Sequence, residues 1–256
     1  MAKASKKYQE IIYEKSFLRE VIARIDFVSP ITKLDKEFPR DISNGIRAVF
    51  PIVETKEAKI DEFEVSKEGT RKRKQVQFTS WEFLAKNRKN KLVVNRNALF
   101  VSYKKYERYE TTRNDFLMAT RELAEVFPNV QARRLGLRYI NEIELPESNP
   151  LDWRDYLHSK TVSLLRYFPD TKYTCRVISI LEYNFGDYMI RCQFGMPNPD
   201  YPAPIIKKIF VLDFDAHTDE QQDIAHLETP LDEFHFAIQD LFEKSIKDGL
   251  RERMND

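Results

Sequence analysis

The chain has 256 residues, a formal net charge of +1, and 42% hydrophobic and 32% charged residues. This composition is typical of a globular protein, and the length suffices to bury a core without a metal or a disulfide. The near-zero net charge gives no overall attraction to nucleic acid or to an anionic membrane. With only 6 glycines, glycine-rich phosphate-binding loops are not expected.

Targeting and redox signals are few. No run of about 18 apolar residues occurs, so no membrane-spanning helix is expected. The basic N-terminus lacks the apolar stretch of a secretory signal, and the sequence therefore predicts a cytoplasmic protein. Cys175 and Cys192 fall four residues out of register on two strands expected to pair, too far apart for a disulfide, and both are expected to be reduced thiols.

Apolar periodicity and Phe-Pro stop signals divide the chain into elements. Residues 1–15 are predicted to form a basic arm. The first half, 16–130, is predicted to contain a strand over 18–28, a helix over 41–50, an antiparallel meander over 52–66, 74–86 and 91–104, and a helix over 112–127 with Thr112 as N-cap. The second half, 131–256, is predicted to contain a strand over 131–145, a helix over 152–168, strands over 173–184, 187–196 and 205–216, and a C-terminal helix opened by Thr229-Pro230.

The predicted order β-α-β-β-β-α therefore occurs twice, and Arg24 and Arg138 fall at matching places in the two copies. We expect an α+β fold with pseudo-twofold duplication, in which a curved antiparallel sheet is backed by helices on one face. The two halves are expected to pack as one globular unit.

Several blocks resemble a sporadically distributed prokaryotic family of unknown function. They include Phe17 to Ile22, Trp81-Glu82-Phe83, the central Gly136-Leu137-Arg138-Tyr139-Ile140-Asn141 block, Leu212 to Asp215, and the tail from Leu231 through His235 to Met254. The resemblance implies a mobile prokaryotic gene of the kind found in antiviral defence or toxin-antitoxin islands. It carries no catalytic residues over to this chain.

The central strand places Arg134, Gly136 and Arg138 on one face. Two guanidiniums around a glycine could bind an anionic group. The alternative is that the arginines pair with acidic residues of neighbouring strands, and that the glycine fits a crowded position. We favour this structural interpretation.

A second polar row, Asp213, Asp215 and His217, alternates along a later strand and could hold Mg²⁺ or Mn²⁺. A solvated strand face explains the same pattern. His235, beside the apolar stripe of the last helix, is expected to be a packed structural residue. No nucleophile elbow, zinc-type Cys/His spacing or Walker loop is present, so the sequence carries no enzyme signature and predicts no cofactor.

Charge is unevenly distributed along the chain. Residues 67–105 hold twelve basic and two acidic residues, a net charge of +10, whereas residues 209–256 hold four basic and thirteen acidic residues, a net charge of −9. The residues proposed for binding in the basic meander are Arg71, Lys72, Arg73, Lys74, Trp81, Arg88, Lys89 and Lys91.

Three functions remain open from the sequence. The favoured one is a non-enzymatic interaction or adaptor subunit that docks a protein partner, such as the product of a neighbouring gene or a second copy, through the basic meander. The alternative is a nucleic-acid-binding protein that uses the same cations and aromatic rings. A metal-dependent enzyme at Asp213, Asp215 and His217 is the third.

Overall fold

The structure is a computed structural model that describes residues 11–65, 71–167 and 171–255. Its strands are β1 (Leu18–Phe27), β2 (Ile52–Val65), β3 (Arg71–Leu84), β4 (Asn90–Asn95), β5 (Ala98–Tyr103), β6 (Gln131–Leu145), β7 (Val177–Asn184), β8 (Met189–Met196), β9 (Lys208–Thr218) and β10 (Gln222–Asp223). Its helices are α1 (Arg40–Val49), α2 (Tyr109–Val126), α3 (Glu228–Ser245) and α4 (Asp248–Asn255), with 3-10 helices η2 (Thr32–Asp35), η3 (Ser163–Arg166) and η4 (Thr171–Tyr173).

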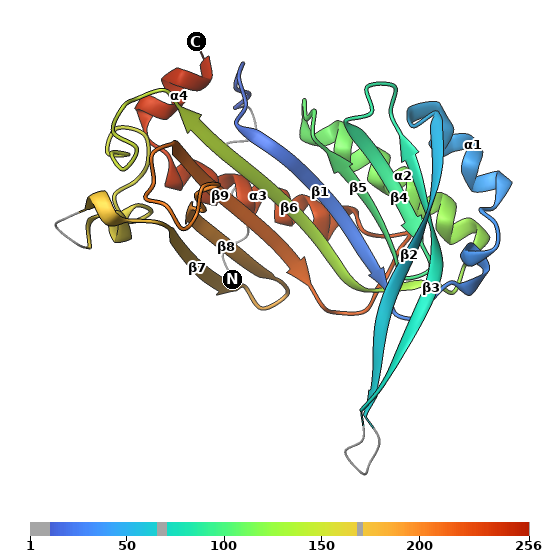
Figure 1. Ribbon diagram of the computed structural model, residues 1–256. Helices are drawn as coiled ribbons and strands as arrows, with labels where there is room; N and C mark the ends of the chain where they lie inside the picture. The colour runs from blue at the N-terminus through green and yellow to red at the C-terminus, as the bar shows by residue number, and fades with distance from the viewer. Residues whose placement is uncertain (1–10, 66–70, 168–170, 256) are drawn as a thin grey trace.

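The strands form one antiparallel sheet in the order β2-β3-β4-β5-β1-β6-β9-β8-β7, with β10 added beside β6 (Figure 1). The central pair is β1 with β6, one strand from each half of the chain. Strands of the first half continue outward from β1, and strands of the second half continue outward from β6. The two halves therefore share a single sheet.

Alternation along the strands separates the two faces of this sheet. On β1, Val21, Ala23 and Ile25 are fully buried, and on β6 Leu135 and Leu137 are fully buried beside them. These residues face the core that the helices cover. The row of Arg134, Gly136 and Arg138 that the sequence predicts therefore lies on the opposite face of β6.

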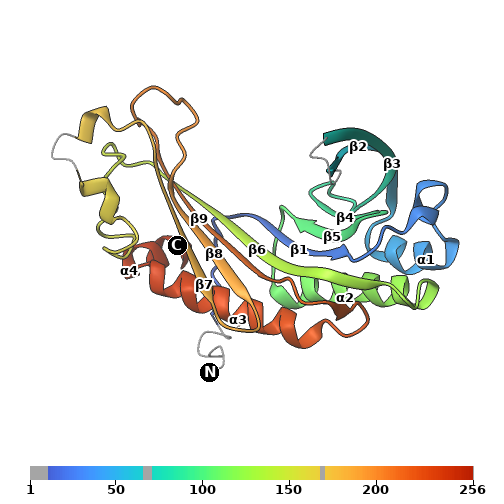
Figure 2. The same cartoon turned by 90° about the horizontal axis from the view of Figure 1, so that it is seen from below.

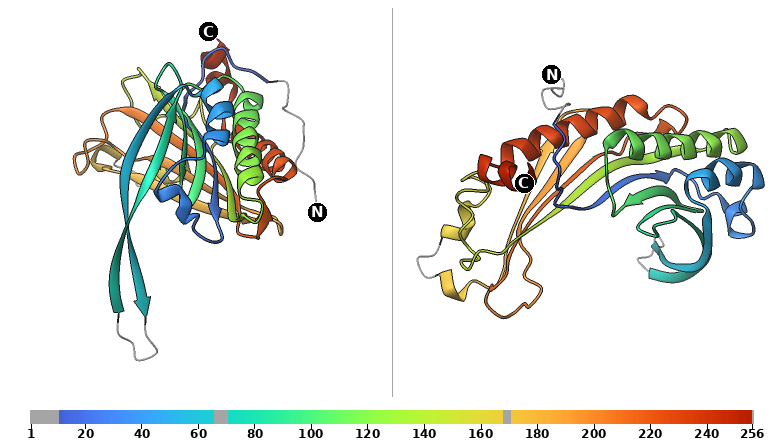
Figure 3. Two further views of the ribbon diagram at one scale, coloured as in Figure 1. Left: turned by 90° about the vertical axis from the view of Figure 1, so that its right-hand side faces the viewer. Right: turned by 90° about the horizontal axis from the view of Figure 1, so that it is seen from above.

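Helices α1, α2 and α3 lie on one face of the sheet, and no α-helix of the described residues covers the opposite face (Figures 2 and 3). The sheet bends around this open face, so that the β2–β3 hairpin and the β8–β9 connection both project on the side away from the helices (Figure 3). The fold is α+β with a curved antiparallel sheet backed by helices, as the sequence predicted. No helix among the described residues is long and apolar enough to cross a membrane.

The repeated β-α-β-β-β-α order is not found in either half. The strand expected over 91–104 is two strands, β4 and β5, joined by a tight turn. In this turn Asn95 Oδ1 accepts hydrogen bonds from the backbone N–H groups of Asn97 at 2.8 Å and Ala98 at 3.1 Å. Such an Asx turn is local chemistry that an extended apolar pattern hides.

The helix expected over 152–168 is also absent, and this segment forms turns and the short η3. Trp153 and Leu157 are buried, but they pack against distant parts of the chain. The Trp153 ring lies 5.4 Å from the Phe210 ring, and Leu157 forms a β-bridge with Ile246. In a regular helix, the backbone groups of Leu157 would bond within the helix. Here they pair with Ile246 instead, so tertiary pairing has replaced the helix.

Two predicted helix starts are shifted. Thr112, expected as an N-cap, is a buried residue inside α2, which begins at Tyr109. Thr229 and Pro230 lie in the first turn of α3 rather than at its cap, because the helix begins at Glu228. The chain then turns at Ile246 and ends in the separate α4.

Candidate functional site

The basic meander of the sequence lies on strands β2 to β5. The side chains of Arg71, Lys72, Arg73 and Lys74 lie outside the part of the chain that the structure describes, although their backbone pairs with β2. The described binding candidates are Trp81 on β3, Arg88 and Lys89 in the β3–β4 turn, and Lys91 on β4.

Two loops bring exposed cations together at one end of the sheet. The β3–β4 turn contributes Lys86, Arg88 and Lys89, and the chain directly after β5 contributes Lys104 and Lys105. The loops are adjacent, because the Lys104 backbone N–H donates to the Lys89 carbonyl at 3.4 Å. We name these five residues the basic corner.

A buried asparagine holds the two loops of the basic corner in register. Asn90 Nδ2 donates to the Lys105 carbonyl at 2.9 Å, and Asn90 Oδ1 accepts from the Lys105 backbone N–H at 2.9 Å. Asn90 is 9% exposed. This two-way bridge fixes the spacing of the cations before any partner binds, which lowers the entropy cost of binding.

Part of the positive charge of the basic corner is not neutralised by neighbours. Arg88 pairs with Glu54 at 2.8 Å, and Lys105 approaches Glu107 at 3.8 Å. Among the described residues, Lys86, Lys89 and Lys104 carry no ion pair. Three unpaired ammonium groups remain on adjacent loops.

By contrast, Lys91 is part of an ion-pair cluster on the open face. Its ammonium lies 3.2 Å from Glu82, which also binds Lys56 at 2.6 Å. Burial would raise the pKa of Glu82, but hydrogen bonds and charges from the two lysines lower it below its usual value. Lys91 is therefore committed to a partner within the chain.

The two arginines of the central strand are also paired internally. Arg138 forms two hydrogen bonds with Asp213, at 2.8 and 2.5 Å, and Arg134 lies 3.2 Å from Asp215. A Cβ added at Gly136 would lie 2.6 Å from Arg134 Nη1, so the Arg134 guanidinium covers the glycine. The gap considered for an anion is filled by the chain itself.

These pairs also occupy the residues considered for a metal. Asp213, Asp215 and His217 do lie on one face of β9, as predicted, with Asp213 opposite Ile140 and His217 opposite Gly136. Arginine neutralises both carboxylates, and no group of three metal-ligating side chains occurs within the described residues. The arrangement fits a ladder of cross-strand ion pairs better than a metal site.

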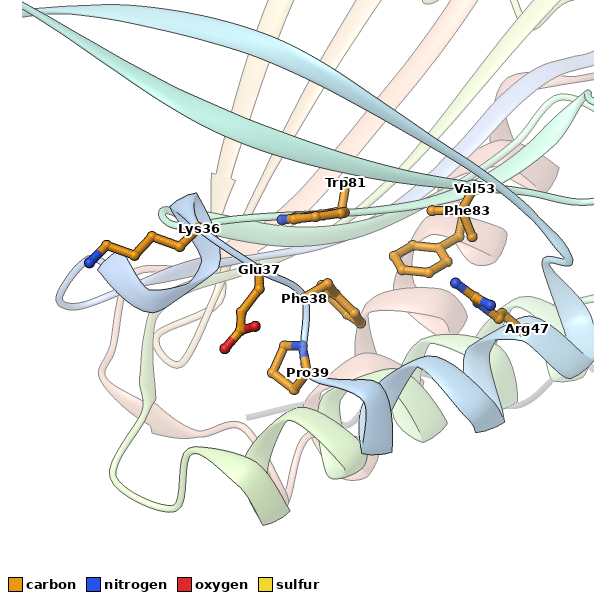
Figure 4. A pocket seen from close by; sticks show the side chains of 8 residues that line it. All are labelled: Lys36, Glu37, Phe38, Pro39, Arg47, Val53, Trp81 and Phe83. Carbon is orange, nitrogen blue, oxygen red and sulfur yellow. The ribbon is translucent and has the colours of Figure 1, made fainter.

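Trp81 faces the helix side of β3 and is half-buried. Its indole N–H donates to the Leu34 carbonyl at 2.8 Å, and its ring packs 5.8 Å from Phe38. It lines a cavity of about 610 Å³ together with Phe83 and Arg47 (Figure 4). Because its ring lies against this cavity and its N–H is satisfied, it is not a free stacking platform on the side of the basic corner.

The acidic C-terminal part of the sequence is partly neutralised within the fold. Five of its carboxylates pair with arginines: Asp213 with Arg138, Asp215 with Arg134, Glu228 with Arg121, Asp232 with Arg113, and Glu243 with Arg251. The opposite charges along the sequence therefore do not correspond to two oppositely charged ends of equal strength.

His235 is a packed residue, as predicted. Its ring stacks on Tyr109 with 3.8 Å between centroids, and its Nδ1 lies 3.0 Å from the Tyr139 hydroxyl. Burial lowers the pKa of His235 to about 4. The neutral ring thus serves the core between α2, α3 and β6.

The residues that sequence reasoning missed are those that build the basic corner from two loops. In the sequence, Lys86, Lys104 and Lys105 contribute only to the net charge of residues 67–105, and Asn90 lies between two predicted strands. An asparagine between a charged turn and an apolar strand was the one local signal. Comparisons with protein-family models, curated proteins and solved structures found no match.

Proposed function

We propose that the protein is a non-enzymatic interaction or adaptor subunit that docks the acidic surface of a protein partner through its basic meander, with the basic corner as the contact. The observation that carries the proposal is the presence of three unpaired lysines, Lys86, Lys89 and Lys104, on two loops locked together by Asn90. Fixed charges of one sign steer an oppositely charged partner and suppress the wrong ones.

The aromatic residues near these cations support a protein partner over nucleic acid. Base stacking requires exposed rings beside a cationic track. Phe83 and Tyr103 are buried, and Trp81 lies on the helix side of β3. Phe100 is half-buried between the cations of Arg24 and Lys91. Phe78 is half-buried as well, so none of these five rings is fully exposed beside the cations.

We further propose that the scaffold is pseudo-twofold. The register of the central strands supports this idea, because Arg24 lies opposite Gly136 and Ile22 lies opposite Arg138. A twofold axis between these two pairs exchanges Arg24 with Arg138, the residues that occupy matching places in the sequence. The resemblance noted above would place the partner among the products of neighbouring genes.

The test is a purification of the tagged chain from its native host at low salt, compared with the triple variant Lys86→Glu, Lys89→Glu, Lys104→Glu. We expect the native chain to retain a protein in stoichiometric amount and the variant to lose it. Retention should fall as salt rises, because the charges are exposed.

A matched control reverses three exposed lysines outside the basic meander, Lys15, Lys33 and Lys160, and should retain the partner. Equal retention by both triple variants would overturn the proposal. Absorbance at 260 nm that disappears on nuclease treatment, with no protein partner, would instead support the nucleic-acid alternative.

A further inference from the structure

Exposed apolar side chains are concentrated on one edge of the molecule, far from the basic corner in the strand order. Of the fourteen large apolar residues exposed in the described chain, ten fall between residues 164 and 206. Five of them belong to β7 and its hairpin turn: Ile178, Ile180, Leu181, Tyr183 and Phe185. Exposed apolar side chains gathered on one edge strand are typical of an interaction site.

The same strand is the last of the sheet, so its outer edge is unpaired among the described residues (Figure 1). The Phe185 N–H donates to the Tyr188 carbonyl across the hairpin. Because hydrogen-bonded pairs alternate along an antiparallel ladder, Val177, Ser179, Leu181 and Tyr183 bond to β8. The backbone groups of the residues between them point outward and can accept another strand.

We propose that β7 pairs antiparallel with β7 of a second copy of this chain, with the twofold axis at Ser179, so that one sheet runs through both copies. Because Ser179 faces itself on this axis, which is perpendicular to the sheet, the numbers of any two paired residues add to 358. Every residue then keeps its own face of the sheet.

This register makes the strand complementary to itself. Ile178 lies opposite Ile180 of the second copy, so that two exposed isoleucines meet on each side of the axis. Directly before the strand, Arg176 lies opposite Glu182 of the second copy. Glu182 has only a 4.0 Å contact with Arg191 in the single chain, and its carboxylate can bind the second guanidinium.

The register also brings the hairpin tip of each copy to a groove of the other. A groove of about 920 Å³ lies where the chain enters β7, between residues 164–167 and 173–178. Tyr183 of the second copy falls opposite Cys175, and Phe185 of the second copy lies beyond it, toward the end of η4 at Tyr173. Both aromatic side chains are exposed in the single chain, at 42% and 39%. The dimer would thus cover the tip, the strand and the groove together.

The first test is the mass of the full chain in solution. Sedimentation or light scattering should give twice the 30.5 kDa of one chain. The double variant Ile178→Lys, Ile180→Lys should shift the mass to that of a single chain, because like charges would face each other across the axis. The matched control, Val28→Lys with Val49→Lys, changes two exposed apolar residues elsewhere and should remain dimeric.

The second test reads the register. Across the axis, Ser179 faces itself in a non-hydrogen-bonded pair, with Cα atoms about 4.5 Å apart, within disulfide range. In a Cys175→Ser background, Ser179→Cys should form an intermolecular disulfide on mild oxidation. Cys192 should not interfere, since burial raises the pKa of its thiol to about 12.

Leu181→Cys in the same background is the control, because its two copies would lie about 13 Å apart. A single-chain mass at every concentration would overturn the proposal. A dimer that persists in the Ile178→Lys, Ile180→Lys variant would also overturn it. Cross-linking through Leu181→Cys in place of Ser179→Cys would overturn the register. Loss of the acidic partner in the basic-corner variant is a separate outcome, because those residues lie on other strands.

Discussion

Replacement of Asn90 by alanine separates the fixed geometry of the basic corner from its charge. The change removes both hydrogen bonds between the β3–β4 turn and Lys105 and leaves all five cations in place. Each such bond contributes about 0.5 to 1.5 kcal/mol, so we expect a loss of about 2 kcal/mol in the free energy of unfolding. For a chain of this length, this corresponds to roughly 4 to 8 °C in melting temperature.

Urea denaturation followed by fluorescence would measure this loss, and binding of the partner should weaken in parallel. Asn87→Ala is the matched control. Asn87 Oδ1 accepts from the backbone N–H groups of Lys89 and Asn90, but Asn87 is exposed and water can replace it. A change of less than about 0.5 kcal/mol for Asn90→Ala would refute the bridge. Full stability loss with unchanged partner binding would refute the role given to fixed geometry.

Two further predictions concern titration. The pKa of His235 is lowered from 6.5 to about 4, so folding favours the neutral ring. About 3 kcal/mol of stability should therefore be lost as the pH falls from 6.5 to 4. The His235→Phe variant should flatten this part of the curve of stability against pH, and an unchanged slope would contradict the assignment. Burial raises the pKa of Glu122, whose Oε2 has no hydrogen-bond partner in the described structure, so its stability contribution is present at low pH and is lost as the pH rises through the folded pKa. Glu122→Gln should therefore raise the melting temperature at pH 7 and have little effect near pH 3. Calorimetry at the two pH values measures this difference, and the opposite trend would contradict the prediction.

Elements defined by local patterns were predicted well. The strand over 131–145 matches β6 at both ends, and α1 and β1 were placed within one residue of each end. Alternation of apolar residues and the Phe50-Pro51 stop signal operate within a few residues of chain. The burial of His235 was predictable for the same reason, since it lies beside the apolar stripe of its own helix.

Elements decided by distant contacts were predicted poorly. Trp153 and Leu157 have a helical spacing, but they pack against Phe210 and Ile246, and no helix forms. Asn95 hides a turn inside an apolar run, so one predicted strand became two. The missing helix thus reflects contacts with residues far along the chain, whereas the divided strand reflects a local side-chain hydrogen bond that apolar periodicity does not reveal.

The sequence by itself determined the fold class, the buried face of the central strands and the excess of basic residues in the meander. These properties depend on residue type and on spacing along the chain. Only the tertiary structure decided which charges remain available. Arg134 and Arg138 are neutralised because β9 lies beside β6 in a register that places Asp215 and Asp213 next to them. By contrast, Lys89 and Lys104 meet on adjacent loops without a carboxylate partner. Register between distant strands is set by the packing of the whole sheet, and a net charge computed along the sequence does not contain it.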